Sequence, residues 1–269
     1  MDDGHSAALE GRSPHGLFLA MDTSGAEGSV AIGLGSDRSG SAQEDAGDKV
    51  DSFPRNPVTR LELLAATSLH ADEEHASLLI PRVNDLLEEV GAGAGELSGV
   101  VVGAGPGSFT GVRVGAATAK GLAWALNLPL WAFSSLAAAA ADVQEEPLRP
   151  RLVLFDARGD RVYAAAYRIG RDGWETLLAP RASTVGEVLD ELVPPGALLM
   201  GDGALRHRAL FEGMGNPVLR PPAGQPSAGG LLRLLSMNPE VPPVEDVGRW
   251  EPDYLRGSGA ERMWKERKG

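Results

Sequence analysis

Two apolar strands that each end in an aspartate limit the possible folds of this chain more than any other feature. LFLAMD (Leu17–Asp22) precedes a polar turn and the apolar SVAIGLG, and LVLFD (Leu152–Asp156) precedes ARGD and RVYAAAY. Both patterns are typical of β-hairpins. Farther along each half, an apolar strand ends in Gly-x-Gly, at GVVVGAG (99–105) and ALLMGDG (197–203). Because the same order of elements occurs twice, we predict an internal duplication with two similar α/β lobes.

Two lobes with a leading aspartate hairpin are the architecture of the actin, hexokinase and Hsp70 type. The expected fold class is therefore α/β, a duplicated actin-like (ASKHA, ribonuclease H-like) two-lobe fold whose ligand cleft lies between the lobes. The 269 residues suffice for two lobes of ordinary size. We expect a flexible tail over 1–16, an N-terminal lobe over 17–130, a C-terminal lobe over 131–256 whose last helix can pack back on the first lobe, and a frayed tail over 257–269.

Helical spacing marks two further stretches. Apolar residues three and four apart predict a helix within residues 61–91, which Pro81 should kink or start and which Gly91 should end. A second helix is predicted over residues 110–126. Residues 36–60 are rich in Ser, Asp, Gly and Pro and are expected to form a long loop.

Composition excludes several kinds of chemistry. The absence of cysteine rules out disulfides, thiolate nucleophiles and cysteine-ligated zinc. The net charge of −12 argues against a protein that grips a nucleic-acid backbone alone, because such proteins present a basic face. No apolar run approaches the roughly 18 residues of a membrane span, and the polar, acidic start is unlike a signal peptide. We therefore expect a cytoplasmic protein with no membrane partner.

The stretch GAGPGSFTG (Gly103–Gly111) lies between an apolar strand and a helix, the usual place of a phosphate-binding loop. It lacks the lysine of a Walker A loop, the nearest being Lys120, and the third glycine of a dinucleotide fingerprint. What remains is backbone N–H groups, with Ser108 or Thr110 as a helix cap. The loop can accept an anion but brings no side chain for chemistry, so a structural role is favoured. The residues expected at any anion or nucleotide site are Asp22, Thr23, Ser24, Gly105, Gly107 and Ser108.

A stripe of small residues follows this loop. Gly111, Gly115 and Ala119 recur every four residues and share one helix face, which lets another element approach closely. A glycine facing solvent in a helix costs about 1 kcal/mol relative to alanine, so the stripe should face something. An internal contact within the lobe and a helix from another subunit both satisfy this pattern.

The remaining candidates for chemistry favour structural roles. Asp22 and Asp156 could position Mg²⁺ or a water beside a phosphate, but an aspartate at a turn more commonly caps that turn through backbone N–H groups. His70 and His75 lie about 140° apart around a helix, which does not clasp a metal. No Gly-x-Ser-x-Gly elbow and no Ser/His/Asp set is present. We expect no catalytic residue, no metal and no cofactor.

Five segments in order resemble the TsaB family, also called YeaZ: LAMDTSGAEGSVAIGL, EHASLLIPRVNDLLEEVG, VVGAGPGSFTGVRVGAATAKGLAWALNLPLWAFSSLAA, LVLFDARGDRVYAAAY and PDYLR. The resemblance covers about residues 17–256, and GPGSFTGVRVGAATAKGLA is its most specific part. It implies the same duplicated fold and a non-catalytic role in synthesis of threonylcarbamoyladenosine on tRNA. In that pathway the related subunit TsaD transfers the threonylcarbamoyl group to the adenosine next to the anticodon.

The resemblance also implies partners and an interface. The two metal-ligating histidine positions of TsaD fall on Ser135 and Ala139, and neither side chain replaces an imidazole ligand. The implied role is a scaffold or activator that forms a heterodimer with TsaD, is joined by the ATPase TsaE, forms a homodimer when TsaD is absent, and meets tRNA only indirectly. The helices from His75 and Thr110 are implied to pack against the partner. The implied interface residues are His75, Leu78, Leu79, Arg82, Thr110, Gly111, Arg113, Val114, Gly115, Thr118, Ala119 and Leu122.

Two other functions remain as alternatives. The first is a nucleotide-dependent phosphotransferase of the actin-like fold, which would use Asp22, Asp156 and the glycine loops. The second, weaker alternative is a peptidase, because TsaD-like proteins were classed that way by resemblance. No nucleophile, ligand pair or activated-water site in the sequence supports it.

Overall fold

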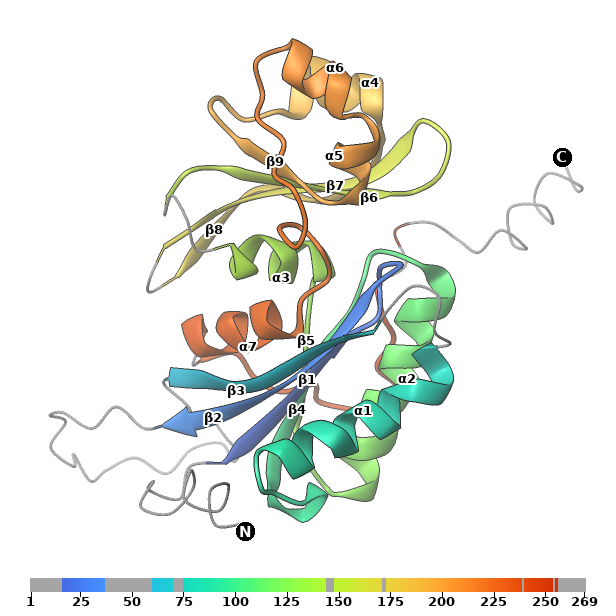
Figure 1. Ribbon diagram of the computed structural model, residues 1–269, viewed down its shortest axis with the longest axis vertical. Coiled ribbons are helices and arrows are strands. Elements are labelled where there is room, and N and C mark those ends of the chain that lie inside the picture. Colours follow the sequence, from blue (N-terminus) through green and yellow to red (C-terminus); the bar gives the residue numbers. More distant parts are fainter. Residues whose placement is uncertain are drawn as a thin grey trace, which may run out of the picture.

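The computed structural model describes residues 16–36, 60–69, 75–143, 148–170, 173–238, 240–253 and 255. Nearly all of the expected tails and of the loop expected over 36–60 lie outside these residues. The described chain forms two sheets, each covered by helices, with two further helices between them (Figure 1). In the part of the chain that is described, no helix is both long and apolar enough to span a membrane.

The first sheet has the strand order β3-β2-β1-β4-β5. Its central strand β1 is antiparallel to β2 and parallel to β4. Every residue of β1 is buried, as expected for a strand with helices on both faces. On one face lie α1 (His75–Glu89) and α2 (Phe109–Ala125), and on the other lies α7 (Ala228–Met237). The strands are β1 (Leu17–Asp22), β2 (Gly28–Ser36), β3 (Arg60–Leu69), β4 (Leu97–Gly103) and β5 (Leu130–Phe133), with the short turn η2 (Ala94–Glu96) before β4.

The second sheet repeats the start of the first. Its order is β8-β7-β6-β9, and β6 is antiparallel to β7 and parallel to β9, as β1 is to β2 and β4. This repetition confirms the predicted duplication and the two-lobe α/β fold class. The strands are β6 (Arg151–Asp156), β7 (Arg161–Ile169), β8 (Trp174–Thr184) and β9 (Leu198–Met200). The short helices are α4 (Val185–Glu187), η3 (Val188–Leu192), α5 (Asp202–Arg206) and α6 (Arg208–Gly213).

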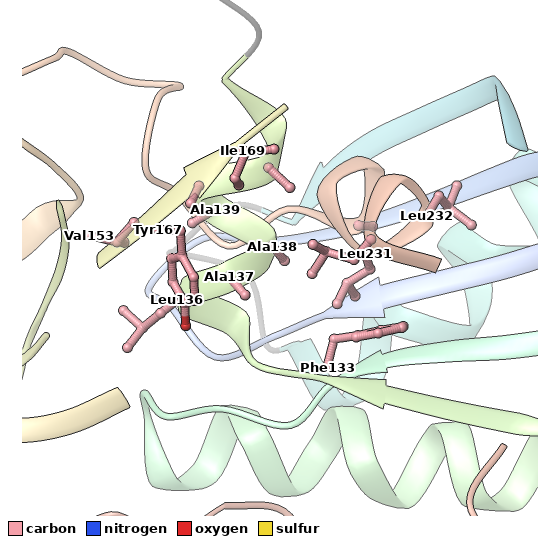
Figure 2. Close-up of a cluster of buried hydrophobic side chains, with 14 of the residues drawn as sticks. Phe133, Leu136, Ala137, Ala138, Ala139, Val153, Tyr167, Ile169, Leu231 and Leu232 are labelled. Carbon is pink, nitrogen blue, oxygen red and sulfur yellow. The ribbon is translucent and has the colours of Figure 1, made fainter. Parts of the chain in front are cut away.

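Two helices form the layer between the sheets. The alanine-rich α3 (Ser135–Asp142) packs on β6 and β7, whereas α7 packs on the strands of the first sheet, and the two helices pack against each other. An added Cβ on Gly230 of α7 would lie 2.0 Å from the Ala138 carbonyl oxygen, so the two backbones touch. Figure 2 shows Ala138 facing Leu231 of α7, with Tyr167 of the second sheet on the other side of α3. The small residues of α3 therefore allow the two sheets to share one core.

The helix predicted within residues 61–91 is wrong for its first part. Residues 60–69 form the edge strand β3, which pairs with β2 along its whole length. The exposed backbone edge of β2 overrides the helical spacing of the sequence, because strand pairing is decided by tertiary context. Pro81 lies inside α1 and neither starts nor ends it. Gly91 does end the helix, with a positive φ of 71° and a bond from its N–H to the Glu88 carbonyl, as predicted.

Two serines cap helices in different surroundings and give a first prediction. The buried Ser227 Oγ accepts a hydrogen bond from the Gly230 N–H at 2.9 Å, and the exposed Ser108 Oγ accepts one from the Gly111 N–H at 3.3 Å. We expect Ser227→Ala to lower the free energy of unfolding by about 1–2 kcal/mol and Ser108→Ala by about 0.5 kcal/mol, measured by urea denaturation. Equal losses of unfolding free energy in the two variants would contradict this prediction, because the buried cap should contribute more than the exposed one.

Candidate functional site

Both hairpin aspartates cap their own turns. An Asp22 carboxylate oxygen accepts a hydrogen bond from the Ser24 N–H at 2.9 Å, and an Asp156 oxygen accepts one from the Arg158 N–H at 2.9 Å. The other Asp156 oxygen pairs with Arg206 of α5 at 2.7 Å. Each aspartate thus makes the i to i+2 contact of an Asx turn, which is the role that the sequence favoured.

Asp22 differs from Asp156 in its burial. It is completely buried at the end of β1, and an added Cβ on Gly103 would lie 2.4 Å from its Cγ. This burial raises the pKa of Asp22 above the ordinary value of 3.8, and the hydrogen bonds from Ser24 offset only part of the rise. Asp22 therefore holds its proton to higher pH than an exposed aspartate would.

This burial predicts a pH-dependent effect of Asp22→Asn. From pH 3.8 up to the raised pKa, the folded state keeps a proton that the unfolded state has released, so the stability that Asp22 contributes falls as the pH rises. Asparagine can still accept the Ser24 bond and carries no charge. We expect the Tm of the variant, relative to the natural chain, to increase across that range and to stay raised above it.

The matched control for this measurement is Asp156→Asn. It removes the partly exposed ion pair with Arg206, so we expect a loss of about 1 kcal/mol or less. A fall in the relative Tm of Asp22→Asn with rising pH would contradict the assignment of a buried, protonated carboxyl.

The glycine-rich loop packs on the first hairpin turn. The Ser108 N–H donates to the Ser24 carbonyl at 2.6 Å, and the Gly105 N–H donates to Ser135 Oγ at 3.2 Å. An added Cβ on Gly107 would lie 2.2 Å from the Ser24 oxygen. The structure thus brings the six candidate anion-site residues together, and the loop donors just named are engaged within the chain. A close backbone contact explains this loop without a phosphate.

The first hairpin also touches the segment that leads into α7. Gln225 Nε2 donates to Glu27 Oε2 at 2.9 Å, and Ser29 Oγ both donates to the Pro226 carbonyl at 3.1 Å and accepts from the Ala228 N–H at 2.7 Å. An added Cβ on Gly25 would lie 2.6 Å from Pro226 Cγ. These contacts join the two parts of the chain beside the hairpin, where the actin-like architecture places its ligand cleft.

The small-residue stripe of α2 makes an internal contact. Thr23 Oγ1 donates to the Gly111 carbonyl at 2.7 Å, and added Cβ atoms on Gly111 and Gly115 would lie 1.9 Å from the Thr23 carbonyl oxygen and 2.5 Å from Thr23 Oγ1. Ala119 is completely buried. Of the two explanations for the stripe, the structure supports the internal contact.

This finding corrects four of the implied interface positions. Leu79, Gly111, Gly115 and Ala119 are buried in the first lobe and cannot touch another chain while that lobe is folded. The side chain of His75 lies outside the described residues, although its backbone begins α1. The positions that stay wholly or partly exposed are Leu78, Arg82, Thr110, Arg113, Val114, Thr118 and Leu122.

Four exposed residues on the outward face of α1 and α2 were not among the predicted interface positions: Ile80, Ala117, Gly121 and Trp124. Ile80 of α1 is 41% exposed and Trp124 of α2 is 85% exposed. Ala117 and Gly121 are also exposed, one turn apart, and an added Cβ on Gly121 would meet nothing within 4 Å. The signal was in the sequence, because Ala117 and Gly121 repeat the four-residue spacing on the opposite side of α2.

Ser135 and Ala139, the two positions that the resemblance implied to match the TsaD metal ligands, make structural contacts. Ser135 Oγ accepts the Gly105 N–H, and Ala139 is completely buried in the core between the sheets. Among the described residues, no group of three or more His, Cys, Asp or Glu side chains could hold a metal ion.

Comparisons with known proteins identify the family to which this chain is similar. The family described as TsaD, tRNA N6-adenosine threonylcarbamoyltransferase, matches residues 68–220. The tRNA threonylcarbamoyladenosine biosynthesis protein TsaB of Bacillus subtilis is 32% identical over 210 residues, covering 76% of this chain and 89% of that protein. A tRNA N6-adenosine threonylcarbamoyltransferase of Streptococcus mutans is 34% identical over 133 residues, covering 47% of this chain and 40% of that protein. The structure of YeaZ from Pseudomonas aeruginosa matches with a TM-score of 0.64 at 25% identity, covering 89% of this chain and 100% of that one.

Proposed function

This chain belongs to the TsaB (YeaZ) family of tRNA threonylcarbamoyladenosine biosynthesis proteins, and from that premise we propose that it is a non-catalytic subunit that binds TsaD. In this proposal the outward face of α1 and α2 is the binding surface, and TsaE joins the assembly through TsaD. When TsaD is absent, the same face pairs with a second copy of the chain. Contact with tRNA is indirect, through the partner that carries out the transfer.

One observation carries the proposal: the exposed pair of small residues on α2. A helical glycine in open space costs about 1 kcal/mol relative to alanine, and Gly121 makes no internal contact that would offset this cost. A small-residue turn lets a partner helix come close, and the apolar Ile80 of α1 adds apolar area to bury. The guanidinium carbon of Arg113 lies 3.8 Å from the centre of the Phe109 ring, and Arg113 supplies a positive charge on the exposed side of α2.

The similarity to TsaD supports the choice of partner. The chain matches both a TsaB protein and a threonylcarbamoyltransferase, so the two proteins share a fold. Two copies of a duplicated fold can pair corresponding helices around a pseudo-twofold axis, as subunits of a homodimer do. Because both pairings use the same helices, a second copy of the chain and TsaD compete for the same face.

The non-catalytic part of the proposal rests on the uses of the candidate catalytic groups. Asp22 is buried and bonds its own turn, and Asp156 is held by Arg206. Ser135 and Ala139 stand where TsaD would place its metal ligands, and both pack in the interior. Each of these residues makes structural contacts that it would have to give up in order to take part in a reaction.

Calorimetry separates this proposal from the phosphotransferase alternative. A kinase of the actin-like fold binds its nucleotide in the cleft beside the hairpins, where Glu27, Ser29 and residues 225–228 contact one another. We expect a titration of ATP with Mg²⁺ into the isolated chain to give no binding in the micromolar range. Micromolar binding together with turnover of an acceptor would favour the phosphotransferase instead. Co-expression with TsaD followed by size-exclusion chromatography should show both chains in one peak.

A further inference from the structure

A C-terminal segment, defined here as residues 240–253, runs along α2. The Val244 N–H donates to the Leu130 carbonyl at 2.7 Å, at one end of the first sheet. Lys120 Nζ of α2 donates to the carbonyls of Gly248 and Trp250, at 2.9 Å each. The Asp253 N–H donates to the Ala104 carbonyl at 2.9 Å, beside the loop that begins α2. The segment therefore ends at the N-terminal end of α2, and residues 256–269 start from there.

Trp124 stands beside this segment. It follows Lys120 by four residues, so the two side chains lie one turn apart on neighbouring parts of the helix surface. Its side chain is 85% exposed, which is unusual for the largest apolar side chain, and it belongs to a helix face that no described residue covers. This part of α2 can bury apolar area if a segment docks on it.

The charges of residues 256–269 suit docking beside the C-terminal segment. The C-terminal segment exposes five acidic side chains and one arginine: Glu240, Glu245, Asp246, Glu251, Asp253 and Arg249. Residues 256–269 carry the opposite balance, with five basic and two acidic residues, and contain Met263 and Trp264. They can reach about 45 Å when extended, whereas the 17 residues of α2 span about 25 Å. Residues 256–269 are therefore long enough to run along α2 as far as Trp124, they start at its N-terminal end, and their charge is opposite to that of the C-terminal segment.

We propose that residues 256–269 of the same chain dock on α2 beside Trp124, along the acidic C-terminal segment, and compete there with the partner protein. The competition rests on the proposed function, whereas the docking does not. In the docked arrangement Trp264 contacts Trp124, and this aromatic pair adds to the free energy gained by burying apolar area. Attachment at residue 255 supplies an effective concentration in the millimolar range, so a weak contact suffices.

Paramagnetic NMR tests the docking directly. The chain has no cysteine, so Ala260→Cys accepts a single nitroxide label. At low salt the label should broaden the Trp124 indole N–H signal and leave that of Trp174, in the second sheet, unchanged. Salt of about 0.5 M should remove the broadening, because it screens exposed charges. The paired substitution Lys265→Glu and Lys268→Glu should remove it at low salt.

Four results separate the possible outcomes. No broadening at low salt overturns the docking, even if TsaD still binds. Broadening of an isotope-labelled, unmodified chain by a separate spin-labelled chain assigns the contact to a second copy and also overturns it. If the docking holds and the faces overlap, Lys265→Glu with Lys268→Glu should tighten TsaD binding about two- to tenfold, as release of an occupied site requires. Docking without any TsaD binding would leave the docking standing and would overturn both the proposed function and the competition.

Discussion

Replacing Gly111 with alanine is expected to destabilise the protein by about 3 kcal/mol or more, one of the two largest effects that the structure predicts. The added Cβ would lie 1.9 Å from the Thr23 carbonyl oxygen, which is backbone and cannot move without moving the first hairpin. Any such shift also disturbs the bond from Thr23 Oγ1 to the Gly111 carbonyl. Overpacking of this kind against backbone belongs to the small set of severe mechanisms. Urea denaturation followed by circular dichroism measures the loss.

The matched control lies on the same helix. Gly121→Ala makes the same chemical change where an added Cβ meets nothing within 4 Å. Higher helix propensity should then raise the free energy of unfolding by about 1 kcal/mol. If the two variants had the same stability, the internal packing of the stripe on Thr23 would be wrong.

The second large effect concerns the partner. Gly121→Leu places a branched side chain on the open face of α2, which should prevent close approach of a partner helix and weaken TsaD binding by at least about 100-fold, as for the centre of an interface. The variant should remain folded and become more stable by about 0.5–1 kcal/mol, since leucine is the better helix former. Thermal unfolding checks the stability, and chromatography of the co-expressed pair checks the binding.

Gly213→Leu serves as the control for this experiment. Gly213 ends α6 in the second lobe, and an added Cβ there also meets nothing within 4 Å. This substitution adds the same side chain far along the chain from α1 and α2, so TsaD binding should not change. Loss of binding by both variants would show that the effect at Gly121 is not local.

The duplication could be predicted from the sequence because each half contains the same short, strongly apolar strands in the same order. The first strand of each hairpin ends in aspartate, and β1 and β6 lie at those residues. The N-terminal serine of α2 was also predictable, since Ser108 is a cap residue before a helical pattern. Local chemistry decides such features, so a single sequence reveals them.

The edge strand β3 and the direction of the stripe on α2 could not be predicted in the same way. Residues 60–69 have helical spacing, and only the open edge of β2 makes them a strand. Gly111 and Gly115 repeat at four residues, as do Ala117 and Gly121, and spacing alone does not say which pair faces the sheet. The position of Thr23 decides this, and that position depends on contacts between residues far apart in the sequence.

We propose that the exposed face of α1 and α2 binds TsaD. Titrating purified TsaD with the natural chain, with Gly213→Leu and with Gly121→Leu in a calorimeter tests it most directly. We expect saturable binding of equal affinity for the first two proteins and no measurable binding for a folded Gly121→Leu. Equal binding by Gly121→Leu would show that TsaD does not pack on this face, because a partner packed there would not tolerate leucine.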